Sequence, residues 1–421
     1  MGEKRDYILW VALPSGERVQ AADIRLETDQ RGRHEASGLR YRSDWLVHPE
    51  RYALNPVHAP LTPEPMEWQT RAISAVLDEL LPGRWERAVQ QRVWGKAGDV
   101  DDLRALLAAP RPTWRVGAVE ILKAGVGPPP LVSPVRASDL EALAQEADRI
   151  DQHEPPDIQV LRQMQAGSSV GGARPKVLYQ APDGARLAKF TRPNDPFDHA
   201  RVEAACLRLA SRAGIEVPEC EVVTAGRAEA LSLHRFDVTP AGGRWNLVSA
   251  NALLKDRKDQ SDCLLASYID LVDLVRKYSS RPEQDLAQLY AQMLFNDAIN
   301  NRDDHLKNFS FVAGPGAFHL SPAYDLVPSE GLGQYPQLTF DLSPIIPTVG
   351  TAKAVEAGRH FCLTPSESSA VNDALGQAFS EIEEVMDEVE LSPRDRRFLI
   401  ARIPPAFRPN DPGKTPAPSL K

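Results

Sequence analysis

The sequence feature that most constrains the fold of this chain is a polar segment near residue 300, which follows a long apolar pattern. Apolar residues recur at helical spacing up to Ile299, which predicts a buried helix. Residues 300–308 are mostly polar, and the apolar run after them predicts a short strand. The sequence therefore places three polar side chains, Asp303, Asn308 and Asp325, in loops on either side of that strand.

This spacing points to phosphoryl transfer, because it is the order that protein kinases use in their catalytic centre. In that order Asp303 takes the proton of the acceptor hydroxyl. Asn308 and Asp325 bind Mg²⁺, a hard cation that prefers oxygen ligands. A polar loop whose Asp and Asn merely cap a turn would give the same short pattern, so the rest of the chain has to decide between the two.

Composition excludes several classes of protein. A chain of 421 residues suggests two or three domains. The net charge of −9 argues against a dedicated nucleic-acid or membrane binder, because broad phosphate binding needs a basic surface. No apolar run reaches the roughly 18–20 residues that span a bilayer. The first residues do not resemble a signal sequence, and four dispersed cysteines predict neither disulfides nor zinc, so we expect a cytoplasmic protein.

Two predicted strands in the middle of the chain suit nucleotide binding. Residues 176–180 and 186–190 are strand candidates joined by an Asp-Gly turn. The second strand carries Lys189, which is either a solvent-facing lysine or a ligand of nucleotide phosphates. The glycine-rich segment before the first strand either lets backbone N–H groups approach phosphate oxygens or is a flexible linker.

A helix is predicted after these strands, with Asp195 as its N-cap, Pro196 at its first position and Gly214 at its end. Glu203 lies on this helix and is the expected partner of Lys189, with a solvated surface acid as the alternative.

Other predicted elements set the organisation of the chain. Residues 28–38 predict a loop, residues 39–47 a strand, and a helix is expected to begin near Glu67. Residues 280–283 resemble a capping box for the helix that leads to Asp303. The predicted domains are an accessory domain (1–135), a kinase N-lobe with the nucleotide loop (136–240), a helical catalytic lobe (241–403) and a disordered proline-rich tail (404–421).

Four segments together resemble the HipA family, the serine/threonine kinase toxins of bacterial type II toxin–antitoxin systems. The segments are 168–176, 234–237, 301–308 and 321–326, and the string Asn-x-Asp-x-His-x-Lys-Asn in the third is highly specific to that family. The resemblance spans nearly the whole chain. It implies an α+β, two-lobed protein-kinase-like fold with a small N-terminal accessory α/β domain and a mostly helical C-terminal lobe.

The resemblance also implies roles for individual residues. Asp303 would be the general base, Asn308 and Asp325 the Mg²⁺ ligands, and Ser169, with Ser168 as the adjacent candidate, the inhibitory autophosphorylation site. A phosphate there would place negative charge beside the ATP phosphates. The implied nucleotide-binding residues are Gly171, Gly172, Ala173, Arg174, Pro175, Lys176, Lys189, His234, Arg235, Phe236, His305, Leu306, Lys307, Asn308, Tyr324 and Asp325.

Two departures from the family stand out. Arg174-Pro175 replaces a common Gln-Glu pair, and proline has no N–H to donate. His234 stands where an acidic residue is common.

The function implied by the resemblance is that of an ATP- and Mg²⁺-dependent kinase that phosphorylates a cellular protein, such as an aminoacyl-tRNA synthetase. The implied partner is a small helix-turn-helix antitoxin, through which DNA would be contacted indirectly, with no membrane involved. Two alternatives remain open: a catalytically weak, kinase-shaped corepressor, and a small-molecule phosphotransferase, since antibiotic phosphotransferases share a similar loop order.

Overall fold

The computed structural model describes residues 3–95, 99, 101–108, 115–128, 135–167, 174–331, 336–341, 343 and 345–408. The predicted autophosphorylation site (Ser168, Ser169) and the first part of the predicted nucleotide loop (Gly171, Gly172, Ala173) lie outside these residues. The chain forms two compact units. Unit 1 comprises Met1–Pro193, Val223–Leu264 and Phe309–His319, and unit 2 comprises Asn194–Val222, Leu265–Asn308 and Leu320–Lys421.

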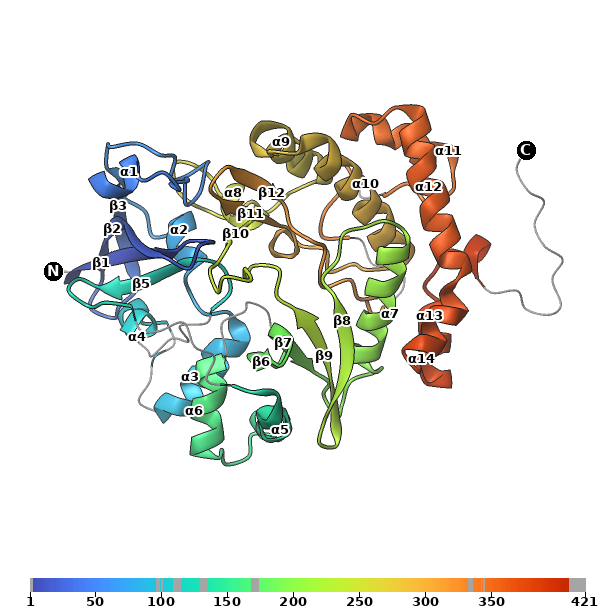
Figure 1. Ribbon diagram of the computed structural model, residues 1–421, viewed down its shortest axis with the longest axis horizontal. Coiled ribbons are helices and arrows are strands. Elements are labelled where there is room, and N and C mark those ends of the chain that lie inside the picture. Colours follow the sequence, from blue (N-terminus) through green and yellow to red (C-terminus); the bar gives the residue numbers. More distant parts are fainter. Residues whose placement is uncertain are drawn as a thin grey trace. The chain divides into compact units, whose positions relative to one another are not determined.

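Unit 1 begins with an antiparallel five-stranded sheet in the order β4-β3-β2-β1-β5 (Figure 1). Its strands are β1 (Glu3–Ala12), β2 (Arg18–Thr28), β3 (His34–Tyr41), β4 (Met66–Trp68) and β5 (Val119–Lys123). Along β2, buried Ala22, Ile24 and Leu26 alternate with exposed Asp23 and Arg25, so one face of the sheet is buried and the other meets solvent.

The predictions for this region were partly wrong. The loop predicted at 28–38 is in fact a tight turn between β2, which ends at Thr28, and β3, which begins at His34. The Asp29 carboxylate stabilises this turn by accepting hydrogen bonds from the backbone N–H groups of Arg31 (2.8 Å) and Arg33 (3.0 Å). The strand predicted at 39–47 ends at Tyr41 and gives way to α1 (Ser43–Val47), in which Trp45 is fully buried. Residues near Glu67 form β4, and α2 (Ala75–Asp78) begins later than expected.

A four-stranded sheet confirms both strands predicted around Lys189. Its order is β6-β7-β9-β8, with β6 (Lys176–Ala181), β7 (Gly184–Phe190), β8 (Cys220–Ala225) and β9 (Ala228–His234). One face of β6 and β7 packs on α3 (Arg84–Trp94), α5 (Leu140–Asp151) and α6 (Ile158–Gly167), which lie together in Figure 1. Val177, Tyr179, Ala188 and Phe190 supply that face of the core.

The remaining elements of unit 1 are α4 (Leu103–Ala108), α8 (Ala250–Leu253) and a three-stranded sheet. This sheet is formed by β10 (Asn246–Ser249), β11 (Ser310–Gly314) and β12 (Ala317–Leu320), in that order. Strand β11 confirms the strand predicted after Asn308.

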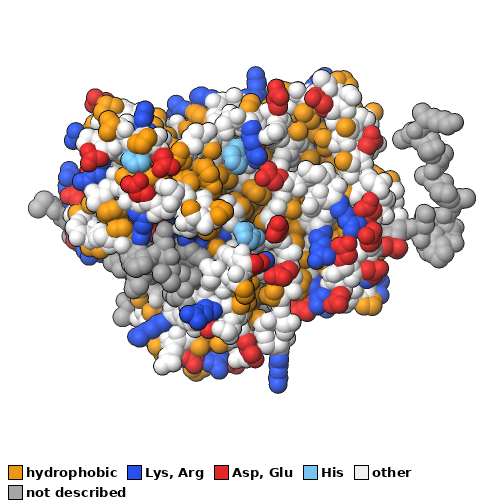
Figure 2. Space-filling model, viewed as in Figure 1, with side chains coloured by type: hydrophobic (Ala, Val, Ile, Leu, Met, Phe, Trp, Pro, Cys, Tyr) orange, Lys and Arg blue, Asp and Glu red, His pale blue; other side chains and the backbone are white. Residues whose placement is uncertain are grey.

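Unit 2 is mainly helical. Its helices are α7 (His199–Arg212), α9 (Tyr268–Tyr278), α10 (Pro282–Ala298), α11 (Ala352–Ala357), α12 (Pro365–Ser380), α13 (Ile382–Glu388) and α14 (Pro393–Ile400). Helix α10 is buried along most of its length and packs on α9 and α12. Arginines of α7 pair with acidic residues of α12–α13 and nearby loops, for example Arg212 with Glu381 at 2.9 Å. Figure 2 shows basic and acidic side chains mixed over α7 and α13.

Two predicted helix starts were wrong by a few residues. Helix α7 is capped by Asp198, whose carboxylate accepts from the backbone N–H of Arg201 at 3.0 Å, in place of Asp195. The reason is Phe197, which is buried against the ring of Phe398 and so delays the helix. Helix α10 begins at Pro282, and its N-cap is Arg281, which makes no side-chain cap, in place of the Ser280 that the expected capping box implies.

None of the described helices combines the length and the apolarity that a membrane crossing would require.

Candidate active site

The loop that carries Asp303 starts from a well-defined helix end in unit 2. Asn300 has φ +57°, the left-handed conformation that closes many helices. The Asn300 N–H donates to the Asp297 carbonyl (3.0 Å) and the Asn301 N–H donates to the Asn296 carbonyl (2.8 Å), which is the hydrogen-bond pattern of a Schellman motif. The end of α10 therefore fixes the backbone from which the loop departs.

The buried side chain of Asn301 connects two of the predicted catalytic residues. Its Oδ1 accepts a hydrogen bond from the backbone N–H of Asp303 (3.2 Å), and its Nδ2 donates to the backbone carbonyl of Asp325 (3.3 Å). The Nδ2 group also donates to Oδ1 of Asn296 at 3.0 Å. One amide thus connects the loop of Asp303, the loop of Asp325 and α10. Asn301 lies in the family-specific motif, but no role for it was predicted from the sequence.

The predicted metal ligand Asn308 is held at the other end of the loop. Its Nδ2 donates to the backbone carbonyl of Asp303 at 2.9 Å, so the amide is fixed and its carbonyl oxygen is the atom left for a cation. Tyr324 closes the same turn by donating its hydroxyl to the carbonyl of Lys307 at 3.0 Å. Leu306 and Asn308 are buried, whereas Lys307 is exposed.

The backbone of Asp325 adopts a conformation that is uncommon for a residue other than glycine. Its φ is +55°, and its carbonyl accepts from both Asn301 and the Val327 N–H (3.1 Å). Backbone conformations of this kind are retained where surrounding contacts enforce them, often at functional sites. The structure therefore brings Asp303, Asn308 and Asp325 onto one hydrogen-bonded framework within unit 2.

A buried carboxylate, Asp304, lies next to the predicted base and was missed by the sequence analysis. Its oxygens accept from the Tyr268 hydroxyl (2.8 Å), the Gln337 N–H (3.0 Å) and the Leu338 N–H (3.4 Å). Burial raises the pKa of Asp304 to about 6, although these hydrogen bonds oppose the shift. Burial beside this carboxylate also raises the pKa of Tyr268 well above its usual value.

Two further side chains of this loop are partly buried: Arg302, for which no role was predicted, and His305, a predicted nucleotide-binding residue. Arg302 forms a half-buried ion pair with Asp297 (2.8 Å), which helps to hold the loop on α10. His305 has a buried Nδ1 that finds no hydrogen-bond partner within the described part of the chain. An unsatisfied buried nitrogen of this kind suits a ligand that would complete its hydrogen bonding.

In unit 1, Lys176 and Lys189 form a cross-strand pair on β6 and β7. They are direct partners in the register, so both side chains lie on the sheet face opposite the α3–α5–α6 core. Both are almost fully buried. Like charges placed directly opposite each other are unfavourable unless an anion or acidic groups compensate them. Leu178 and Leu187 continue the same face with apolar side chains.

The other predicted nucleotide residues of unit 1 are placed as follows. Arg174 is half-buried, and Pro175 is buried and accepts from the Phe190 N–H at 3.0 Å through its carbonyl. His234 ends β9, and Phe236 is half-buried.

Arg235 uses its side chain for a structural contact. Its guanidinium forms a buried ion pair with Asp237 (2.7 Å) and donates to the carbonyl of Arg115 at 2.8 Å. Asp237 in turn accepts from the Gly117 N–H at 2.8 Å. Burial opposes ionisation, but the charge and hydrogen bonds of Arg235 dominate and lower the pKa of Asp237. This segment is therefore anchored to the residues that lead into β5.

The predicted partner of Lys189, Glu203, is buried on α7 in unit 2. The ion pair between Lys189 and Glu203 stays a prediction, as does the convergence of Lys189 with the unit 2 framework.

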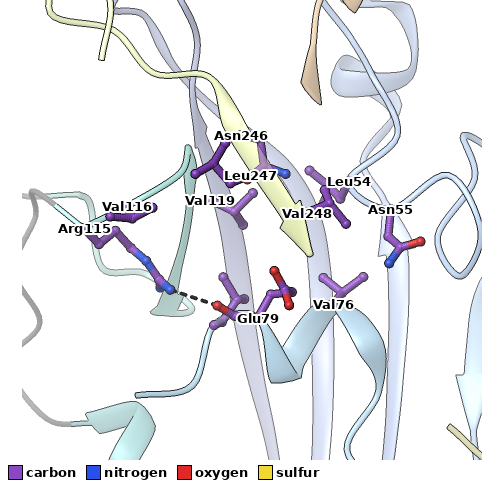
Figure 3. Close-up of a pocket in the computed structure, with 11 residues that line it drawn as sticks. Leu54, Asn55, Val76, Glu79, Arg115, Val116, Val119, Asn246, Leu247 and Val248 are labelled. Carbon is purple, nitrogen blue, oxygen red and sulfur yellow. Dashed lines mark hydrogen bonds between the residues drawn. The ribbon is translucent and has the colours of Figure 1, made fainter. Parts of the chain in front are cut away.

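Two cavities lie within unit 1. The first, about 30 Å³ and shown in Figure 3, is large enough for one water molecule and contains none of the predicted site residues. Arg115, Glu79 and Asn246 line it together with apolar side chains. The second is an open cavity of about 970 Å³ lined by His234, Gly184 and neighbouring residues.

The residues of the framework fit a magnesium–nucleotide complex. Asn308 and Asp325 offer an amide oxygen and carboxylate oxygens, which are the ligands that Mg²⁺ prefers. Two protein ligands suit this ion, because Mg²⁺ usually keeps several waters and binds substrate phosphates as well.

Comparisons with known proteins agree with this picture. Residues 168–391 match the family model of the HipA-like C-terminal domain. The toxin YjjJ of Escherichia coli (strain K12) is 27% identical over 245 residues, which cover 53% of this chain and 54% of that protein. Y4mE of Sinorhizobium fredii is 29% identical over 148 residues, 34% of each chain. The chain thus aligns with about half the length of one curated relative and a third of the other.

A solved structure extends the likeness to the whole fold. HipA of Shewanella oneidensis MR-1, determined in a complex with HipB and operator DNA, has a TM-score of 0.62 and 19% sequence identity. The match covers 93% of this chain and 94% of that chain. It confirms the predicted α+β, two-lobed kinase-like fold. Together with the family model, which spans more than half of the sequence, it leads to one conclusion: the chain belongs to the HipA family.

Proposed function

We propose that this protein is an ATP- and Mg²⁺-dependent serine/threonine kinase that acts as a HipA-like toxin. The observation that carries the proposal is the framework around Asn301, which joins the backbones of Asp303 and Asp325, while Asn308 is bonded to Asp303. A structural loop has no need to hold a general base and two oxygen ligands of a hard cation in fixed relation. Phosphoryl transfer requires that arrangement, because its catalysis is mainly positioning and charge neutralisation.

In the proposed reaction, the oxygen of a serine or threonine hydroxyl forms a bond to the γ-phosphorus of ATP. The bond from that phosphorus to the β–γ bridging oxygen breaks, and ADP leaves. Asp303 accepts the hydroxyl proton. Asn308 and Asp325 would hold Mg²⁺, which when bound neutralises charge on the phosphates. Lys189 and Lys176 would contact phosphate oxygens from the sheet face that they share.

The same proposal covers substrates and partners. The protein substrate would be a cellular protein used in translation, such as an aminoacyl-tRNA synthetase, and the chain would also phosphorylate its own Ser169 or Ser168. A small helix-turn-helix antitoxin would bind the kinase and bring it to DNA. Support for such a partner comes from family membership and from the Shewanella HipA, which was solved with HipB and operator DNA.

The test is transfer of a radioactive γ-phosphate from ATP to the chain itself and to proteins of a cell extract. The wild type is compared with Asp303→Asn and with Asp373→Asn, a matched change at an exposed aspartate on α12. We expect labelling by the wild type and by Asp373→Asn, its loss on chelation of Mg²⁺, and at least a hundredfold lower rate for Asp303→Asn. Equal labelling by Asp303→Asn would remove that residue from the reaction. No labelling by any protein would favour a corepressor without kinase activity.

A further inference from the structure

The carboxylate of Asp303 has a side-chain partner that the sequence analysis did not foresee. Nε2 of Gln337 donates a hydrogen bond of 2.7 Å to Oδ1 of Asp303. The two residues are 34 positions apart in the sequence, and both are exposed to solvent. A hydrogen bond between exposed side chains adds little to stability, so its significance depends on how firmly Gln337 is held.

The backbone of Gln337 is held by the buried carboxylate next to the base. Oδ1 of Asp304 accepts from the N–H groups of both Gln337 (3.0 Å) and Leu338 (3.4 Å). Its other oxygen accepts from the Tyr268 hydroxyl at 2.8 Å. Leu338 is buried and anchors the segment on its apolar side. Two adjacent residues therefore hold the same short segment. Asp303 accepts a hydrogen bond from the Gln337 side chain, and Asp304 accepts one from the Gln337 backbone.

A second anchor follows immediately in the chain. Thr339 forms a parallel β-bridge with Ser267, and its carbonyl accepts from the Tyr268 N–H at 2.9 Å. Ser267 is itself fixed as the N-cap of α9 by a capping box with Asp270. The segment around Gln337 is thus held against the start of α9, which fixes the backbone position from which the Gln337 side chain extends.

We propose that Gln337 is a positioning residue for the general base. By donating to Oδ1 of Asp303, it fixes the rotation of the carboxylate and leaves Oδ2 to accept the proton of the substrate hydroxyl. A freely rotating carboxylate would spend most of its time out of line with that proton, and small misplacements in a catalytic site cost large factors in rate. This inference rests on the proposed function, because it assigns Gln337 to the same base.

The test uses three substitutions that separate the hydrogen bond from the shape of the side chain. Gln337→Met keeps the length but cannot donate, Gln337→Glu keeps the shape but offers only acceptors, and Gln337→Lys restores a donor. The control is Gln377→Met on α12, since Nε2 of Gln377 likewise donates to an exposed carboxylate, Glu381, at 2.8 Å. Initial rates of label transfer are measured against ATP concentration for each protein.

We expect Gln337→Met and Gln337→Glu to lower the maximum rate about tenfold to a hundredfold, with the half-saturating ATP concentration changed by less than about twofold. Gln337→Lys should recover part of the rate, and Gln377→Met should match the wild type. An unchanged rate for Gln337→Met would overturn the proposal, and a raised rate would show that Gln337 obstructs the base. The two proposals fail differently: an inactive wild type refutes the kinase, whereas an active wild type that needs Asp303 but not Gln337 refutes only the positioning role.

Discussion

Nδ2 of Asn301 donates a hydrogen bond to the backbone carbonyl of Asp325 across 24 residues of sequence. Because Oδ1 of the same amide accepts from the Asp303 N–H, the predicted base and the loop of the predicted metal ligand Asp325 share one buried side chain. The rate of phosphoryl transfer depends on how such residues are positioned relative to one another. The amide is therefore the best single place at which to disturb the site without touching a group that would react.

Asn301→Ala should lower the transfer rate about a hundredfold and cost about 1–3 kcal/mol of unfolding free energy, since it removes three buried hydrogen bonds. Asn372→Ala is the matched control. Asn372 is also buried and makes three hydrogen bonds, to Tyr290, Ser368 and Gly350, away from the loop. We expect a similar fall in stability by denaturant titration but an unchanged rate. Equal loss of activity in both variants would mean that the effect of Asn301 is only on folding.

Tyr268→Phe removes the hydroxyl that donates to Asp304 and accepts from Nδ2 of Asn296. A hydrogen bond to a carboxylate favours its charged form, so its loss should raise the pKa of Asp304 above about 6. The acidic limb of the rate–pH profile should then move to higher pH. Tyr290→Phe removes a buried hydroxyl on α10 that donates to the Ala354 carbonyl on α11, and it should leave that limb in place.

Titration of Asp304 should make the stability of the protein fall and its activity rise as the pH increases. Its native pKa of about 6 lies above its ordinary 3.8, so between these values the native state binds a proton that the unfolded state does not. The free energy of unfolding from this group therefore falls as pH rises from about 4 to 6, by about 3 kcal/mol in all. Activity should rise over the same range, because the protonated carboxyl cannot accept all three hydrogen bonds.

The measurement is denaturant unfolding at pH 5 and pH 7 for the wild type and for Asp304→Asn, which cannot titrate. Other buried carboxyl groups with raised pKa values, such as Asp297 and Glu120, contribute with the same sign in both proteins and cancel in the comparison. The wild type should lose more stability than Asp304→Asn between these pH values. Identical losses would show that Asp304 does not titrate in this range.

Asp237→Asn should destabilise the protein by about 3–5 kcal/mol, because it leaves the guanidinium of Arg235 buried without its charge partner. If this segment contacts adenine, the half-saturating ATP concentration should rise as well. Asp6→Asn is the control, since it removes the partner of Arg25 in an ion pair between two exposed side chains and should change the melting temperature little. A Tm for Asp237→Asn equal to that of the wild type would contradict the structural role of the buried pair.

The sequence predicted those parts of the fold that are set by local patterns. Apolar spacing located α10 and the strand after Asn308, and the Asp-Gly turn located the β6–β7 hairpin. Predictions failed where burial overrode a local signal. Asp195 and Pro196 are a good helix start, but burial of the Phe197 ring moved the cap to Asp198.

The other contacts of the site could not be predicted from the sequence, because they join residues that lie far apart in the chain. Tyr268, Asn296 and Asn301 form a hydrogen-bonded chain that ends on Asp304 and Asp325, and no spacing rule connects α9 to those loops. Gln337 lies in a segment rich in Gly and Pro with no periodicity, so nothing in the sequence marks it as a partner of Asp303. The only signal was the presence of Asn301 and Asp304 inside a family-specific string.

We expect Asp303, Asn308, Asp325 and Lys189 to meet around one metal–nucleotide complex. The decisive measurement is a crystal structure of the chain with Mg²⁺ and a non-hydrolysable ATP analogue. We predict a metal ion about 2.0–2.1 Å from Oδ1 of Asn308 and from a carboxylate oxygen of Asp325, with Nζ of Lys189 on a phosphate oxygen. Nucleotide bound elsewhere, with no metal on Asp325 and no phosphate near Lys189, would contradict this prediction.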